Sequence, residues 1–298
     1  MTIPAHQSVG RHRSLPSSAV VLGARGMVGR SWCGLLTAHG VPFRAVSRPD
    51  FDLDTPESIA DTVRAGDELV INAAAWTDVD GAERDEAGAT RANATAPGLL
   101  ARRCAALGAF LIHYSTDYVF QGRSSTPYRI DAPIDPVNAY GRSKAAGEDE
   151  VRREAGANHL ILRTSWVYAP WGKNFVRTIA QLAAQRDTIR VVDDQRGRPT
   201  SAEDLAVSSL AIYLAGGTGT WHATDAGECS WHGLAAEIVR RLGFSCRVDP
   251  CTTAEFPRPA ARPSYSTLDV SATERLIGGL PDWQPALARV LRRLDRTD

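Results

Sequence analysis

Short apolar runs alternate with longer amphipathic stretches through the first half of the chain. The stretches predict helices at Met27–His39, Pro56–Arg64, Ala82–Leu107 and Tyr140–Ala155. The runs predict strands at Ala19–Leu22, Phe43–Val46, Leu69–Ile71, Ala109–His113 and Leu160–Leu162. Strands that alternate with helices return by crossovers, so the sheet is expected to be parallel with helices on both faces. The pattern predicts a doubly wound α/β fold, in which ligands bind beyond the carboxyl ends of the strands.

The second half of the chain is less regular and richer in proline and glycine. Helices are predicted at Asn174–Gln185 and Ser230–Leu242, while a helix at Ala202–Leu214 and a strand at Gly219–Ala223 could return to the main sheet. Residues 1–17 are polar and predict a flexible leader. We therefore expect a main unit over 18–165 with a return segment near 200–225, and a smaller unit over 166–199 and 226–298.

Composition excludes several classes of protein. The 298 residues hold 34 basic and 34 acidic side chains, so the chain lacks the charge expected for binding nucleic acid or an anionic membrane. No apolar run reaches the roughly 18 residues that span a bilayer, and no signal peptide is expected at the N-terminus. The five cysteines form no C-x-x-C pair, which is typical of reduced thiols in a cytoplasmic protein.

A glycine-rich turn follows the first predicted strand. The turn carries Gly23, Gly26 and Gly29 and opens the helix at Met27–His39. In such a turn the first glycine permits a tight bend, the second lets backbone approach a pyrophosphate, and the third lets helix pack on strand. A chance cluster is the alternative, because the chain has 25 glycines. The order strand, turn, helix favours a dinucleotide site.

The residues after the second predicted strand bear on which nicotinamide cofactor binds. An acidic residue there bonds the adenosine ribose and repels a 2′-phosphate. Here the strand is followed by Ser47 and Arg48, and Arg25 in the glycine turn is a second candidate cation. A hydroxyl and guanidinium groups suit a phosphate, so NADPH is predicted over NADH. The alternative is that these are ordinary solvent-exposed residues in a chain with 32 arginines.

The pair Tyr140 and Lys144 is the second candidate group. The chain contains only two lysines, Lys144 and Lys173, and Lys144 stands four residues after Tyr140 on one predicted helical face. A cation one turn away is expected to lower the pKa of a phenol from its usual value near 10. Such a phenol could exchange a proton with a carbonyl. Upstream, an apolar strand ends in the hydroxyls of Ser115 and Thr116, which could hold a substrate oxygen or could simply be capping residues.

Taken together, these segments resemble the dTDP-4-dehydrorhamnose reductase family of extended short-chain dehydrogenases/reductases. The resemblance spans about residues 20–270. Its carriers are G-A-R-G-M-V-G (23–29), I-N-A-A-A-W-T-D-V-D-G-A-E (71–83), H-Y-S-T-D-Y-V-F-Q-G (113–122), D-P-V-N-A-Y-G-R-S-K-A-A-G-E (135–148), L-R-T-S-W-V-Y (162–168), G-K-N-F (172–175), V-V-D-D-Q-R-G-R-P-T (191–200), G-E-C-S-W (227–231) and A-R-P-S-Y-S-T-L-D (261–269). The glycine turn also resembles GDP-fucose synthase, but the later motifs do not.

The resemblance implies a role for each residue that matches a family motif. Tyr140 would protonate the C4 oxygen of a sugar, Lys144 would bind the nicotinamide ribose, and Thr116 would hold the ketone oxygen. The cofactor side would be completed by Met27, Val28, Asp52, Leu53, Ala74, Ala75, Trp76, Thr77 and Tyr114. The substrate side would comprise Asp117 and Trp166, with Asn174, Arg198 and Arg262 holding the nucleotide diphosphate. In the alternative interpretation Trp166 is a core residue and Arg262 a solvated loop cation.

The implied function is NADPH-dependent reduction of the C4 ketone of a dTDP-4-keto-6-deoxyhexose, namely dTDP-4-dehydro-L-rhamnose to dTDP-L-rhamnose, with NADH left open. A 4-ketoreductase for another dTDP-deoxysugar of natural-product biosynthesis is one alternative. Another is a non-catalytic nucleotide-binding subunit, like the regulatory subunit of methionine adenosyltransferase, against which the set Thr116, Tyr140 and Lys144 argues. Some relatives use a metal at a dimer contact. No acidic cluster in this sequence indicates one, so no metal is expected, and a homodimer is left open.

Overall fold

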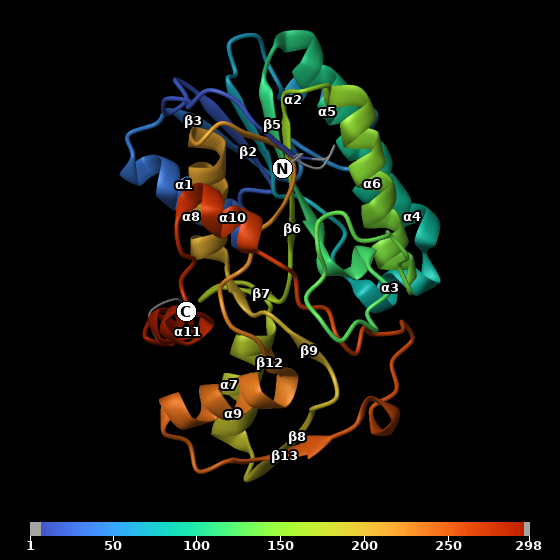
Figure 1. The fold of residues 1–298 in the computed structure, drawn as a ribbon, viewed down its shortest axis with the longest axis vertical. Helices are drawn as coiled ribbons and strands as arrows, with labels where there is room; N and C mark the ends of the chain where they lie inside the picture. Colours follow the sequence, from blue (N-terminus) through green and yellow to red (C-terminus); the bar gives the residue numbers. More distant parts are fainter. Residues whose placement is uncertain (1–6, 295–298) are drawn as a thin grey trace.

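The computed structural model describes residues 7–294, and its centre is a seven-stranded sheet in the order β1-β11-β6-β5-β4-β2-β3 (Figure 1). All neighbouring strands run parallel except the edge pair β1 and β11. Its strands are β1 (Gln7–Val9), β2 (Ala19–Leu22), β3 (Phe43–Val46), β4 (Leu69–Asn72), β5 (Phe110–Thr116), β6 (His159–Thr164) and β11 (Gly217–His222). The doubly wound parallel sheet predicted from the sequence is confirmed, and the predicted return strand is β11.

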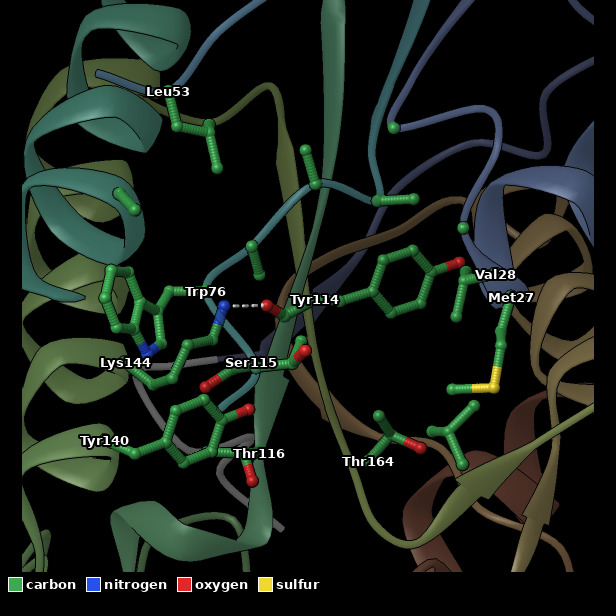
Figure 2. Close-up of a pocket in the computed structure, with 18 of the residues that line it drawn as sticks. Met27, Val28, Leu53, Trp76, Tyr114, Ser115, Thr116, Tyr140, Lys144 and Thr164 are labelled. Atoms are coloured by element: carbon green, nitrogen blue, oxygen red, sulfur yellow. Dashed lines mark hydrogen bonds between the residues drawn. The ribbon is translucent and has the colours of Figure 1, made fainter. Parts of the chain in front are cut away.

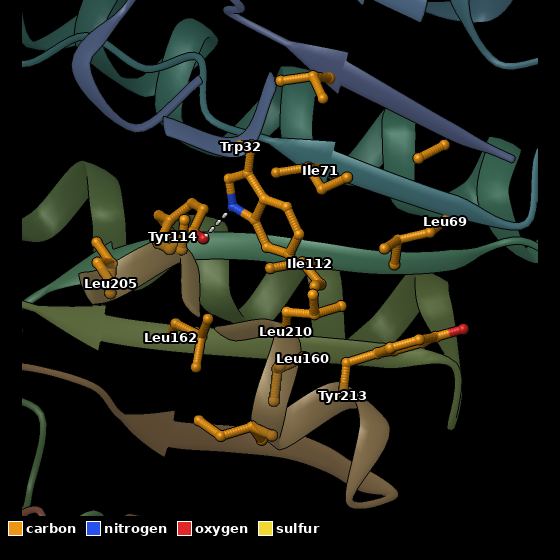
Figure 3. Packing of buried hydrophobic residues seen from close by; sticks show 14 of the residues in the cluster. Trp32, Leu69, Ile71, Ile112, Tyr114, Leu160, Leu162, Leu205, Leu210 and Tyr213 are labelled. Atoms are coloured by element: carbon orange, nitrogen blue, oxygen red, sulfur yellow. Dashed lines mark hydrogen bonds between the residues drawn. The ribbon is translucent and has the colours of Figure 1, made fainter. Parts of the chain in front are cut away.

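Helices cover both faces of this sheet, as the alternation of buried residues along the strands requires. On one face the strands pack against α1 (Met27–Ala38) and α8 (Ala202–Leu214), where Trp32, Leu36 and Tyr213 are almost completely buried (Figure 3). On the other face they pack against α2 (Pro56–Thr62), α5 (Ala96–Leu107) and α6 (Ala139–Ala155). Successive residues of each strand point to opposite faces of the sheet, so each strand contributes to two separate cores.

The long helix predicted over Ala82–Leu107 is interrupted in the structure. It is divided into α3 (Val79–Arg84), α4 (Glu86–Thr90), a π-helical turn at Arg91–Thr95 and α5. Asp85 ends α3 and caps α4 by accepting a hydrogen bond from the backbone N–H of Gly88. An aspartate that caps a new helix competes with continuation of the old one, which explains the break.

Part of the flexible leader predicted over residues 1–17 forms a short strand in the structure. Strand β1 pairs antiparallel with β11, and Arg13 donates hydrogen bonds to the carbonyls of Tyr213 and Gly217. The Arg13 guanidinium also lies 4.5 Å from the ring centroid of Phe110. Residues 1–6 lie outside the described residues.

A smaller unit with its own core lies at the other end of the molecule (Figure 1). Its helices are α7 (Phe175–Gln185), α9 (Trp231–Leu242) and α11 (Trp283–Leu291), and α10 (Ser271–Ile277) packs on α8 of the main unit. Three short strand pairs complete the fold: β7 (Val167–Tyr168) with β10 (Thr200–Ser201), β9 (Arg196–Gly197) with β12 (Cys229–Ser230), and β8 (Thr188–Val192) with β13 (Arg247–Cys251). Within residues 7–294, none of the helices has the length and apolar character needed to cross a membrane.

Candidate active site

A cavity of about 920 Å³ opens at the carboxyl ends of the parallel strands. Its wall combines the turn before α1, the ends of β3, β4 and β5, the first turns of α6, and residues of the smaller unit. This volume is in the range of cofactor and ligand sites. The predicted residues that line it are Gly23, Arg25, Gly26, Met27, Val28, Ser47, Arg48, Asp52, Leu53, Ala74, Ala75, Trp76, Thr77, Tyr114, Thr116, Asp117, Tyr140, Lys144 and Trp166.

The glycine turn has the geometry that the sequence predicted for an anion site. Gly23 has φ +74°, and a Cβ there would lie 2.8 Å from the backbone nitrogen of Ala74. Gly29 lies outside the cavity wall, where a Cβ would lie 2.2 Å from the Gly23 carbonyl oxygen, so only glycine lets α1 pack this closely. Gly26, at the N-cap of α1, has no side chain to accept from the first turn, and that turn has no acidic residue. The free N–H groups of α1 therefore suit an anionic group.

Ser47 and Arg48 at the end of β3, together with Arg25 in the adjacent glycine turn, lie where the adenosine ribose would be recognised. The Ser47 hydroxyl accepts a hydrogen bond from the backbone N–H of Arg25 at 3.2 Å. Arg25 and Arg48 are exposed and line the cavity. Neither forms an ion pair with a carboxylate among the described residues. Both guanidinium groups are therefore available to a phosphate.

Tyr140 and Lys144 lie one above the other on α6 and face the cavity (Figure 2). Asn138 caps this helix by accepting from the backbone N–H of Gly141 at 2.8 Å. A Cβ on Gly141 would lie 2.2 Å from the Tyr118 carbonyl oxygen, so the first turn of α6 packs directly on the residues that follow β5. This close packing brings Tyr140 beside the end of β5.

The predicted effect of Lys144 on the phenol is not found in the structure. Burial, and to a smaller extent the negative charge of Asp117, raise the pKa of Tyr140 to about 12, and a hydrogen bond with Thr116 partly offsets this rise. The Lys144 ammonium, which is 2% exposed, instead donates to the Tyr114 carbonyl oxygen at 2.5 Å (Figure 2). Burial lowers the pKa of Lys144 to about 8. The desolvation of the phenol, which raises its pKa, therefore outweighs the pKa-lowering effect that was expected from a cation one helical turn away.

The end of β5 supplies two polar side chains next to Tyr140. The Thr116 hydroxyl donates to Asp117 Oδ1 at 2.9 Å. Oδ2 of Asp117 is buried and forms no hydrogen bond of ordinary geometry among the described residues. Burial raises the pKa of this carboxyl group to about 6, although the Ser266 and Thr116 hydroxyls lower it. A buried carboxylate oxygen without a donor is costly, so a hydroxyl-bearing ligand in the cavity would complete its hydrogen bonding.

Trp166 lines the cavity and holds an unusual backbone conformation. Its φ is +47°, a left-handed value that bulky residues rarely adopt. The indole stacks on Trp231 with ring centroids 3.6 Å apart, and a Cβ on Gly197 would lie 2.6 Å from it. The ring is therefore fixed by its neighbours, and the strained backbone is typical of a residue placed for contact with a ligand.

Three residues predicted to hold a diphosphate do not line the cavity. The Asn174 amide donates to the carbonyls of Ala169, Trp171 and Gly172, and its oxygen caps α7. Arg262 is paired with Asp80 at 2.9 Å, and Arg198 is partly buried beside the cavity wall. Asn174 and Arg262 are therefore engaged with protein groups, whereas the buried Nε of Arg198 has no hydrogen-bond partner among the described residues, so a diphosphate role for Arg198 stays a prediction.

Sequence reasoning missed Asn93, which organises one wall of the cavity. Its amide oxygen accepts from the backbone N–H of Trp76, and its NH₂ group donates to the Trp76 carbonyl and the Ser143 hydroxyl. Asn93 lies in the π-helical turn, on which α6 packs so closely that a Cβ on Gly147 would lie 2.0 Å from the Asn93 carbonyl. An interrupted helix is common at functional sites, but no local sequence signal indicates this one.

A buried ion-pair network lies directly behind the site. Glu148, one helical turn after Lys144, accepts from both Nε and Nη2 of Arg163 at 2.8 and 2.6 Å and from the Ser115 hydroxyl at 2.6 Å. Burial alone would raise the pKa of Glu148, but Arg163, Arg152 and Ser115 together lower it to about 2. The network ties α6 to β5 and β6 beside the catalytic candidates. No group of three or more metal-ligating side chains occurs among residues 7–294.

Comparison with known proteins identifies similar chains. The family model described as RmlD substrate binding domain matches residues 18–296. The dTDP-4-dehydrorhamnose reductase of Burkholderia thailandensis is 41% identical over 92% of this chain and 98% of its own length. A probable dTDP-4,6-dihydroxy-2-methyloxan-3-one 4-ketoreductase of Streptomyces antibioticus is also 41% identical, over 90% of this chain and 92% of its own. The dTDP-4-dehydrorhamnose reductase of Bacillus anthracis, solved with NADP, superimposes with a TM-score of 0.88 at 33% identity, covering 93% and 99% of the two chains.

Proposed function

Because this chain belongs to the RmlD substrate-binding-domain family of dTDP-4-dehydrorhamnose reductases, we propose that it reduces the C4 ketone of dTDP-4-dehydro-L-rhamnose with NADPH. Membership makes it an NAD(P)H-dependent oxidoreductase that acts on dTDP-4-keto sugars. The single observation that carries the proposal is that Tyr140, Lys144 and Thr116 meet in one cavity beneath the glycine turn. A non-catalytic nucleotide-binding subunit would not need this set.

The cavity residues fit a dinucleotide phosphate. The turn from Gly23 to Gly29 leaves no room for a Cβ at either end, and the N–H groups of α1 face an anionic group there. Arg25, Ser47 and Arg48 supply two unpaired guanidinium groups and a hydroxyl for a 2′-phosphate. On the opposite side, Trp76 and Lys144 would hold the nicotinamide half.

The proton is delivered by the protein. When bound, NADPH supplies a hydride to the ketone carbon. The phenol of Tyr140 is fully protonated at neutral pH because its pKa is about 12, so it is ready to donate to the developing oxyanion, which is a stronger base than a phenolate. Thr116 would hold the ketone oxygen beside this phenol by turning its hydroxyl, which donates to Asp117 Oδ1, toward that oxygen.

The sugar would lie against Asp117 and Trp166. The free Oδ2 of Asp117 accepts a hydrogen bond from a sugar hydroxyl, and the fixed indole of Trp166 packs against the hexose face. These contacts would orient the ketone carbon.

A second candidate is a 4-ketoreductase for another dTDP-deoxyhexose. The Streptomyces antibioticus relative, named for such an activity, is as similar to this chain as the rhamnose-forming relative from Burkholderia. The two candidates differ in the sugar whose ketone is reduced.

The test is incubation of the purified protein with NADPH and dTDP-4-dehydro-L-rhamnose, followed by NMR of the product. We expect NADPH oxidation and a product with the configuration of dTDP-L-rhamnose. Turnover with other dTDP-4-keto sugars but not with this one would favour the second candidate. No oxidation with any member of the panel would contradict the reductase assignment.

The preference for NADPH is testable at Arg48 and Arg25. We expect Arg48→Ala, alone or with Arg25→Ala, to raise KM for NADPH about tenfold, the scale of one charged hydrogen bond, and to leave KM for NADH nearly unchanged. Arg64→Ala removes an exposed cation between α2 and β4, at the amino end of the strands, and is the matched control. Equal changes for both cofactors would contradict a 2′-phosphate role.

A further inference from the structure

The segment between β7 and α7 lies on the first turn of α1, although some 140 residues separate them. Gly172 has φ +71°, and a Cβ there would lie 3.3 Å from Met27 Cγ. The indole N–H of Trp171 donates to the Met27 carbonyl oxygen at 3.3 Å, and the Trp171 ring packs in one cluster with Met27 and Val28. This segment therefore contacts the turn that the dinucleotide would use.

The backbone of the segment is held firmly in this position. The Trp171 ring lies between two guanidinium groups, Arg30 at 4.6 Å and Arg293 at 5.2 Å from its centroid. Asn174 donates to the carbonyls of Ala169, Trp171 and Gly172. The Asn174 side chain thus holds the segment in place, and its NH₂ group has no donor left for an anion.

Lys173 is the residue of this segment whose charged group has no bonding partner among the described residues. It lines the same cavity as Gly26 and Met27, it is exposed, and it forms no ion pair within the described residues. The first turn of α1 has no acidic side chain either. A cation beside the positive end of a helix, with no carboxylate between them, is unfavourable unless an anion binds there.

On the basis of the dinucleotide site proposed above, we propose that Lys173 binds the pyrophosphate of the cofactor from the side opposite the glycine turn. The N–H groups of α1 face one side of the diphosphate, and the Lys173 ammonium neutralises the other. A compact ammonium on a long flexible stem reaches such a group where a planar guanidinium fork would need more room. This explains why one of only two lysines in an arginine-rich chain stands here.

The pyrophosphate is common to NADPH and NADH, which gives the proposal a distinctive signature in binding. We expect Lys173→Gln to raise Kd about tenfold for both cofactors, measured by titration calorimetry without sugar substrate. The ratio of the two Kd values should stay unchanged. Lys173→Arg should recover only part of the lost affinity, because it keeps the charge but its guanidinium fork needs more room. The control Arg186→Gln removes an exposed cation at the other end of α7 and should bind normally.

Other results would overturn the proposal. Unchanged Kd values in Lys173→Gln would show that the ammonium does not contact the cofactor. A loss confined to NADPH would place it at the 2′-phosphate, and a rise only in KM for the dTDP-sugar would assign it to the substrate diphosphate. Failure of the wild-type protein to bind either cofactor is a different outcome, because it would contradict the proposed function itself.

Lysine labelling tests the same contact in the unmodified protein. Lys144 is 2% exposed whereas Lys173 is exposed, so an acetylating reagent should modify Lys173 first, as read by peptide mass spectrometry. We expect NADP⁺ and NADH to protect Lys173 and dTDP alone to leave it reactive. Protection by dTDP alone, or equal labelling with and without both cofactors, would overturn the proposal.

Discussion

Replacing Tyr140 with phenylalanine is expected to lower kcat by about 100-fold or more, the usual scale for the loss of a positioned acid. The change removes the hydroxyl that bonds to Thr116 and donates the proton, and it leaves the ring and the glycine turn in place. Affinity for NADPH should therefore stay within a few-fold of wild type. Single-turnover oxidation of NADPH measures the first effect, and calorimetric titration measures the second.

Tyr118 provides the matched control for this experiment. Its ring lines the same cavity and lies edge-on to Tyr140 with centroids 5.9 Å apart. Tyr118→Phe also removes one buried phenolic hydroxyl, but this hydroxyl is not on the helical face of Lys144. We expect Tyr118→Phe to keep kcat within about fivefold of wild type, a much smaller loss than the one expected for a missing acid. If Tyr118→Phe is the inactive variant and Tyr140→Phe turns over normally, the acid has been assigned to the wrong residue.

Much of the fold was predictable because its signals are local. Each buried strand is a short apolar run between helical stretches, and the helix Ala202–Leu214 was predicted with the bounds that the structure has. Strand β1 was missed because Gln7–Val9 is short and mostly polar, and it forms only by pairing with β11 about 210 residues away. The break in the helix at Asp85 depends on a single cap that competes with helix propensity.

The site shows the same division between local and tertiary causes. The glycine turn and the pair Tyr140 and Lys144 follow from spacing alone, and the structure brings them into one cavity. The pKa of Tyr140 could not be predicted, because burial by distant segments decides it. In G-K-N-F the resemblance assigned a ligand contact to Asn174 and gave no role to Lys173. Backbone carbonyls of the preceding loop occupy the Asn174 amide, which leaves Lys173.

Replacing Glu148 with glutamine is expected to lower the free energy of unfolding by about 3 to 5 kcal/mol. The side chains of Glu148 and Arg163 are 1% and 3% exposed, so the variant leaves a guanidinium charge buried without its counter-ion. Glu86→Gln is the matched control, because Glu86 makes a similar two-point contact with Arg142 but both side chains are nearly half exposed. Loss of this exposed ion pair should lower the free energy of unfolding by at most about 1 kcal/mol. Urea unfolding at pH 7 measures the free energy of unfolding of both variants. Equal losses in the two variants would contradict the explanation that burial of an unpaired charge destabilises Glu148→Gln.

The effect of Glu148 should also depend on pH in a defined direction. Its pKa is about 2 in the folded protein, whereas a glutamate in an unfolded chain titrates near 4.3. A depressed folded pKa means that the ionised carboxylate stabilises the fold fully above pH 4.3 and loses this effect as the pH falls toward 2. The stability gap between wild type and Glu148→Gln should therefore be constant from pH 7 to pH 5 and narrow below pH 4. A gap that widens on acidification would mean that Glu148 is protonated in the folded protein, and its pairing with Arg163 would not be ionic.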